Sequence, residues 1–280
     1  MAIATVLAFV AAIPAQGALF DRLFAPKARL WERWTVHQPS STAVVDHRPW
    51  SALLARYVTV ADDGIARFAY RDVDAQDRRL LEDYLASLSQ VPIDEYGRGE
   101  QRAFWINLYN ALTVSIVLER YPVASIRDID LSSGLFSRGP WKAKRVSVAG
   151  QMLSLNDIEH RILRPIWRDA RLHYAVNCAS IGCPNLAREA FTAANTEELL
   201  ERAARAYVNH PRGAHFAGES LIVSSIYVWF EGDFVAHSGS VLSHLRRYAE
   251  GDLAARLAAV SRFDDHAYDW RLNDADASPR

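Results

Sequence analysis

The sequence predicts a single mixed α+β domain, mostly helical, with a small and largely antiparallel sheet. Three observations lead to this fold class. Helical patterns dominate the chain, the predicted strands come as hairpins rather than strictly between helices, and no linker divides the chain. Apolar residues make up 50% of the 280 residues, which is enough for a core of ordinary size.

The first half is predicted to combine a hairpin with three helices. The first elements are a helix over 50–57, strands 57–60 and 65–70 around the turn Asp62-Asp63-Gly64, and a helix over 74–88. The helix over 100–119 is apolar on nearly every side and is closed by Pro122, so we expect it to be central and buried. Its amides Asn107 and Asn110 then either bond to neighbouring backbone or face a pocket.

The second half alternates short strands and helices. Expected are a hairpin of 145–148 and 152–153, a helix over 156–163, a buried strand over 172–177, a helix beginning at Pro184, a helix up to Val208, a β-rich stretch over 220–229 and a helix over 241–248. Two capping boxes are predicted, Asn156 with Glu159 and Asn195 with Glu198.

The N-terminus has the layout of a secretory signal peptide. Residues 3–13 are almost wholly apolar, Pro14 follows, and Ala15-Gln16-Gly17 offers small residues for cleavage before Ala18. No Lys or Arg precedes the apolar core, so a buried N-terminal helix is the alternative. We expect a signal peptide at 1–17, a single domain over 18–280, and a periplasmic or secreted protein.

Composition narrows the range of partners. The 32 basic and 33 acidic residues are balanced, and no basic run is longer than a pair such as Arg246-Arg247. A nucleic-acid partner would require clustered positive charge and is therefore not expected. No stretch of the mature chain is long and apolar enough for a membrane span, which needs about 20 residues. The expected partner is an unknown small molecule or peptide.

The segment from His173 to Pro184 gathers more reactive groups than any other. On a strand, Cys178 would leave at the strand's end, and Cys183 would stand just before a helix that begins at Pro184. A helix N-terminus favours the thiolate form of a nearby cysteine. The candidate catalytic residues are therefore Cys183, Cys178, and two possible bases, His173 and His160.

Candidate substrate-binding residues surround this segment. Asn177, Asn107 and Asn110 are able to orient an imidazole or donate to an oxyanion. Glu159 is adjacent to His160, but neighbouring helical residues do not face one another. The pattern therefore favours Glu159 as a helix cap over Glu159 as the group that orients the His160 imidazole.

Three less reactive readings stay open. Cys178 and Cys183 are able to form a structural disulfide, whose short loop contributes roughly 2 kcal/mol on a chain-entropy basis. Each histidine is equally compatible with a satisfied structural role. A zinc site of the two histidines and two cysteines is conceivable, but C-x4-C is looser than the usual zinc pairs, so neither a metal nor a cofactor is expected.

Several motifs together resemble the domain-of-unknown-function family numbered 547. They are Phe104-Trp-Ile-Asn-Leu-Tyr-Asn-Ala-Leu112, Leu155-Asn-Asp-Ile-Glu-His160, His173-Tyr-Ala-Val-Asn-Cys178, Gly182-Cys-Pro184, Ile226-Tyr-Val-Trp-Phe-Glu-Gly-Asp-Phe234, Tyr268-Asp-Trp270 and Leu272-Asn273. The resemblance implies an often exported bacterial domain, related to papain-like and transglutaminase-like folds in which a thiol at a helix start meets a histidine. Here the histidine precedes the cysteines, which differs from the usual order.

Two function hypotheses follow. The first is a thiol-dependent hydrolase or acyltransferase acting on amide, peptide or thioester bonds, with Cys183 preferred to Cys178 as nucleophile and His173 or His160 as base. The second is a non-enzymatic cell-envelope module that binds a ligand and carries a structural Cys178–Cys183 disulfide. Thiol–disulfide exchange is a weaker third, because the spacing is not C-x-x-C.

Overall fold

A computed structural model describes residues 25–131 and 139–276, and the predicted signal peptide at 1–17 lies outside these ranges. The α-helices are α2 (Arg48–Tyr57), α3 (Ala75–Ser89), α4 (Arg98–Arg120), α5 (Leu155–Asp157), α6 (Arg164–Trp167), α7 (Thr196–Val208), α8 (Ile226–Trp229), α9 (Glu231–Ser238), α10 (Val241–Tyr248) and α11 (Gly251–Ala259). Short 3₁₀ helices are η1 (Glu32–Thr35), η2 (Tyr70–Asp72), η3 (Ile93–Glu95), η4 (Ile126–Asp128) and η6 (Ala170–Tyr174), and η5 (Ile158–Leu163) is a π-helix.

The strands form three small sheets in the described ranges. They are β1 (Val58–Val60), β2 (Ala66–Phe68), β3 (Val146–Val148), β4 (Gln151–Leu153), β5 (Ala214–Ala217), β6 (Ser220–Ser224) and β7 (Asp265–Ala267). The pairs β1–β2, β3–β4 and β5–β6 are antiparallel, and β7 joins β6 in parallel. The predicted mixed α+β class with largely antiparallel strands is therefore confirmed.

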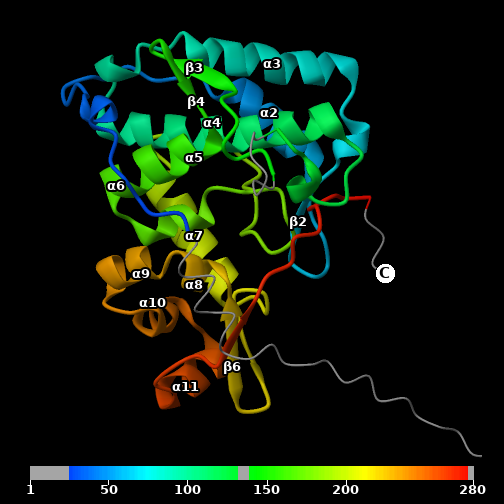
Figure 1. Cartoon of the computed structure of the whole chain (residues 1–280), viewed down its shortest axis with the longest axis vertical. Coiled ribbons are helices and arrows are strands. Elements are labelled where there is room, and N and C mark those ends of the chain that lie inside the picture. Colours follow the sequence, from blue (N-terminus) through cyan, green and yellow to red (C-terminus); the bar gives the residue numbers. More distant parts are fainter. Residues whose placement is uncertain (1–24, 132–138, 277–280) are drawn as a thin grey trace, which may run out of the picture.

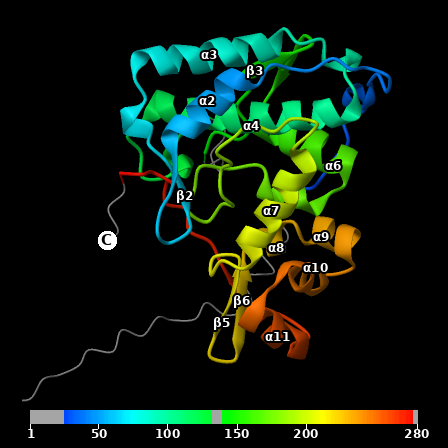
Figure 2. The same cartoon turned by 180° about the vertical axis from the view of Figure 1, so that it is seen from behind.

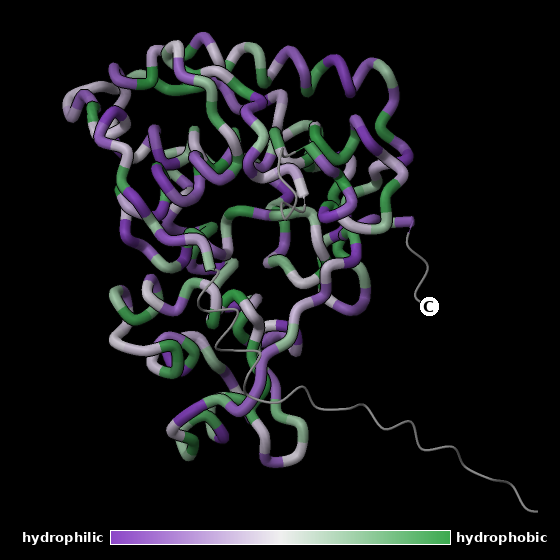
Figure 3. Tube along the Cα trace, viewed as in Figure 1, coloured by the Kyte–Doolittle hydropathy of each residue, from purple (hydrophilic) through white to green (hydrophobic). Residues whose placement is uncertain are grey.

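Helix α4 is the centre of the larger part of the molecule (Figure 1). Phe104, Ile106 and Leu108 are fully buried, because the helix is apolar on nearly all sides and is packed by neighbours all round. Its predicted range and burial are confirmed. The outer helix α3 packs on it with one face and carries hydrophilic residues along its length (Figure 3).

Two hydrophobic clusters make up the core. The first is built around α2, α3, α4, β3, β4 and η5, and the second around α7, α8, α9, α10, α11 and the sheet β5–β6–β7. They occupy the upper and lower parts of Figure 1. The C-terminal segment 265–275 links them: it leaves β6 and reaches β2, where the Phe68 N–H donates to the Asn273 carbonyl at 2.8 Å (Figure 2).

Four local predictions were wrong. The first capping box is formed by Ser154 and Asp157, and Asn195 makes no cap bond to α7. The helix predicted over 156–163 continues to Trp167 through η5 and α6. The β-rich stretch ends at Ser224, after which α8 begins. Three of these are shifts in position of two to five residues, the commonest kind of error when caps and short apolar runs are interpreted locally, and the fourth is a missing cap bond at a correctly placed helix start.

Within the described residues, no helix combines the length and the apolar character needed to cross a membrane.

Candidate functional site

A cavity of about 370 Å³ lies between the two hydrophobic clusters, a common place for ligand sites. It is lined by Ala25, Pro26, Tyr109, Trp141, Lys142, Asn156, Glu159, His160, His173, Val176, Cys178, Cys183, Pro184, Ile226, Trp229, Phe230, Tyr268 and Trp270. The four predicted catalytic residues and Glu159 are all in this lining. The structure thus gathers them from η5, η6 and the loop after η6.

The two cysteines of the pocket lie at disulfide-bonding distance from each other. Their Cα atoms are 6.3 Å apart, within the range that a disulfide spans. Cys183 is buried and Cys178 partly exposed. The Cys183 sulfur accepts from the Cys178 N–H at 3.0 Å and from the Tyr268 hydroxyl at 3.2 Å. Of the readings left open by the sequence, the geometry therefore agrees with the bonded pair.

The backbone around the cysteines differs from the prediction. His173 belongs to the 3₁₀ helix η6, not to a strand, because a short apolar run suits either when it is buried. No helix begins at Pro184, since the next helix is α7 at Thr196. The argument that a helix N-terminus stabilises the Cys183 thiolate is therefore wrong.

Close backbone packing fixes the cysteine loop instead. The Gly182 N–H donates to the Asp269 carbonyl at 2.8 Å. A Cβ at Gly182 would lie 2.8 Å from the Asp269 nitrogen, closer than atoms can approach. Glycine is thus required where the loop meets the C-terminal segment.

His173 lies between two carboxylates. Its Nε2 is 2.8 Å from Asp233 Oδ2, and its Nδ1 is 3.9 Å from Glu159 Oε1. Its ring stacks on Phe230 with the centroids 4.1 Å apart. Burial opposes the charged form of Asp233, but hydrogen bonds from His173 and Arg164 outweigh burial and hold its pKa well below its usual range.

His160 is held as a neutral ring. Burial lowers its pKa to about 4. The Arg164 guanidinium donates to its Nδ1 at 3.0 Å, which requires that nitrogen to be unprotonated. The distance from His160 Nδ1 to Glu159 Oε1 is 3.7 Å, too long for a hydrogen bond.

The π-helical turn η5 explains why the neighbours Glu159 and His160 both line the pocket. A π-helix has a wider turn than an α-helix, so consecutive side chains diverge less. Glu159 is thus a buried pocket residue and not the helix cap that the spacing predicted. π-Turns within helices occur frequently at functional sites.

The three predicted asparagines are bonded to backbone and are not in the pocket lining. Asn107 accepts from Phe191 N–H at 2.9 Å and donates to its carbonyl at 2.7 Å. Asn110 bonds the Asn177 N–H and the Ala175 carbonyl, each at 2.8 Å. The Asn177 amide bonds Pro184 and Ala179 backbone. These amides position the cysteine loop on α4.

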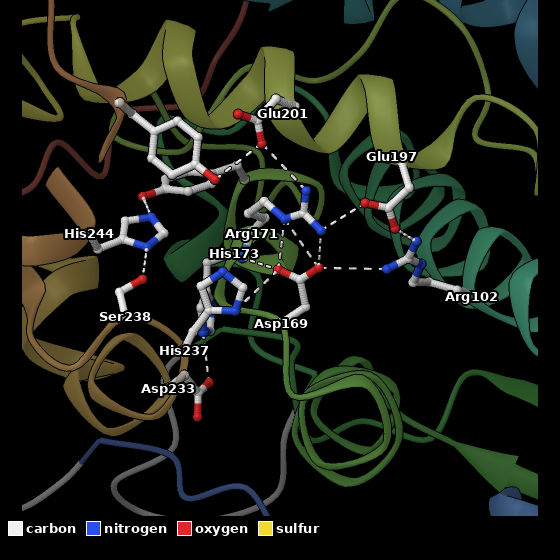
Figure 4. Close-up of polar contacts among 12 residues, drawn as sticks. Arg102, Asp169, Arg171, His173, Glu197, Glu201, Asp233, His237, Ser238 and His244 are labelled. Carbon is white, nitrogen blue, oxygen red and sulfur yellow. Dashed lines mark hydrogen bonds and ion pairs between the residues drawn. The ribbon is translucent and has the colours of Figure 1, made fainter. Parts of the chain in front are cut away.

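A charge cluster behind His173 anchors η6 (Figure 4). Asp169 caps the start of η6 and accepts from Arg171 at 2.6 Å, with Arg102 of α4 3.6 Å away. Burial opposes the charge of Asp169, but Arg171 outweighs it and lowers the carboxyl pKa. The cluster ties the segment that carries His173 to α4 and α7.

Sequence reasoning missed two parts of the site. Asp233 is 60 residues from its partner His173. Four rings form a continuous aromatic wall. The ring centroid of Tyr268 is 4.8 Å from that of Trp229 and 4.7 Å from that of Trp270, and Trp141 joins at Trp270 with the centroids 5.9 Å apart. The motifs 226–234 and 268–270 contain Asp233 and three of the four rings, but from the sequence they indicated only the family resemblance and no role.

No group of three or more His, Cys, Asp or Glu residues in the described ranges is arranged to hold a metal ion.

Comparison with known proteins gives one family. Residues 93–208 match the family described as protein of unknown function, DUF547. This range covers α4 to α7 and with them His160, His173 and both cysteines. No curated protein and no solved structure matches the chain. The segment 93–208 is therefore a DUF547 domain.

Proposed function

We propose that the protein is a ligand-binding module of the cell envelope, with the Cys178–Cys183 disulfide forming part of the pocket wall. One observation carries the proposal: the sulfurs contact each other, while both imidazoles contact other groups. Among the described residues, the sulfurs' other hydrogen-bond partners are Ser180, Tyr268 and the Cys178 N–H. A cysteine nucleophile needs a thiolate with a base within hydrogen-bond reach.

The pocket itself suits a small ligand. Its volume of about 370 Å³ falls within the range typical of ligand sites, about 300–1,000 Å³. Six of the eighteen lining residues are Tyr, Trp or Phe, and charged or polar side chains such as Glu159 and Asn156 also reach it. The envelope location rests on the apolar segment 3–13 and on the cysteine pair, because disulfides persist in oxidising compartments.

A thermal-shift screen of small molecules tests this function. A ligand should raise the Tm of the wild type and of the control Phe216→Ala, because Phe216 lies on β5 outside the pocket. It should not raise the Tm of Trp229→Ala, because this substitution removes part of the aromatic wall. The absence of any stabilising compound, or equal shifts in both variants, would contradict a ligand site here.

A thiol-dependent hydrolase or acyltransferase is the second candidate. The observation in its favour is that Cys178, Cys183, His160 and His173 line one pocket. It requires reduction of the cysteine pair and movement of an imidazole to a sulfur. Turnover of thioester or peptide substrates that appears only with reductant, and is lost in Cys183→Ser, would establish it in place of the binding module.

A further inference from the structure

We propose that the ligand carries a protonated amine, which the Glu159 carboxylate binds beside the aromatic wall of Trp141, Trp229, Tyr268 and Trp270. This inference rests on the proposed binding function and adds the chemical class of the ligand.

Glu159 places a carboxylate inside the pocket with little solvent. Its side chain is 10% exposed, and burying a carboxylate is costly unless a cation or several donors compensate. The neighbouring Tyr109 phenol is hydrogen-bonded to it, and burial raises the pKa of Tyr109 well above its usual range, so this donor is uncharged. A neutral donor alone leaves most of the burial cost of the charge in place.

The basic side chains near Glu159 make contacts of their own. Arg164 bonds Asp233 at 2.6 Å and His160 at 3.0 Å. His173 gives its Nε2 to Asp233 at 2.8 Å and lies 3.9 Å from Glu159, beyond hydrogen-bond distance. Lys142 lines the pocket at its exposed edge and has interactions of its own. Neither imidazole is within hydrogen-bond distance of the Glu159 carboxylate, and the Arg164 guanidinium bonds Asp233 and His160 instead.

The aromatic wall favours the same kind of ligand. The faces of Trp rings carry negative electrostatic potential and attract cations. Trp270 already contacts one cation of the chain, the Arg127 guanidinium, which lies 5.0 Å from its ring centroid. The wall also provides apolar surface for a body attached to the charged group. An amine on an apolar or aromatic body therefore matches both the carboxylate and the rings.

Three probes that share one aromatic body test the charge preference: 2-phenylethylamine, the neutral 2-phenylethanol and the anionic 3-phenylpropionate. Binding to the full-length wild type is measured by calorimetry at pH 7. We expect the amine to bind about tenfold more tightly than the alcohol or better, and the anion most weakly, because a charge-assisted hydrogen bond to a buried carboxylate is strong.

Glu159→Gln removes the charge but keeps an oxygen to accept from Tyr109, and far-UV circular dichroism checks its folding. The variant should lose the amine preference and keep the affinity for the alcohol, while Glu82→Gln on the exposed side of α3 should behave as wild type. Equal wild-type affinities for the three probes, tighter binding of the anion, or an unchanged preference in Glu159→Gln would overturn the inference and leave the binding function standing. If neither the probes nor any screened compound bind, the proposed function itself fails.

Discussion

Asn110→Ala should destabilise the protein strongly, because Asn110 serves two buried backbone groups. Its amide bonds the Asn177 N–H and the Ala175 carbonyl, each at 2.8 Å, and the residue is 2% exposed. Leaving one buried polar group without a partner costs about 1–3 kcal/mol, so two of them cost about 2–6 kcal/mol. That is a large part of the about 5–15 kcal/mol that stabilises a typical domain.

Urea unfolding followed by circular dichroism measures this loss. Asn209→Ala is the matched control, since its amide also bonds backbone carbonyls, of Arg205 and Tyr248, but near solvent. Water replaces those bonds, and the control should lose about 1 kcal/mol or less. A loss in Asn110→Ala no larger than in the control would refute the view that Asn110 fixes the cysteine loop on α4.

Three further outcomes are expected. Burial lowers the pKa of His47 to about 4, so between pH 6.5 and 4 the unfolded chain binds more protons than the folded one and stability falls as the pH falls. His47→Gln should remove roughly 3 kcal/mol of that fall. If urea unfolding shows the same loss of stability from pH 7 to pH 4 in the wild type and in the variant, this assignment is wrong. Replacing both Cys178 and Cys183 by Ala should lower the free energy of unfolding by about 2 kcal/mol, and an unchanged urea midpoint would contradict a bonded pair. Gly182→Ala should lower the Tm because its Cβ would lie 2.8 Å from a backbone nitrogen, whereas Gly232→Ala in α9 meets nothing within 4 Å and should be neutral or stabilising; similar shifts in both would count against the close approach.

The elements with strong local signals were predictable. Helix α4 carries an apolar pattern over more than twenty residues, and the hairpins β1–β2 and β3–β4 have turn residues between short apolar runs. In these segments the local preference and the tertiary environment favour the same structure.

The site was only partly predictable for a physical reason. The sequence singled out His173, Cys178 and Cys183 because reactive residue types cluster there. It did not reveal the π-turn that directs Glu159 into the pocket, since a π-turn breaks the 3.6-residue period on which such reading depends. The contact of Asp233 with His173 joins residues far apart in the chain, and one sequence carries no pairing signal for it.

Alkylation of the native protein tests the central claim most directly, because the binding module and the thiol enzyme differ in the state of Cys178 and Cys183. The protein is purified without reductant, treated with iodoacetamide near neutral pH and weighed by intact mass spectrometry. The account predicts no added mass until a reductant is present, and then two alkyl groups. Rapid addition of one or two groups without reductant would contradict it and favour the thiol enzyme.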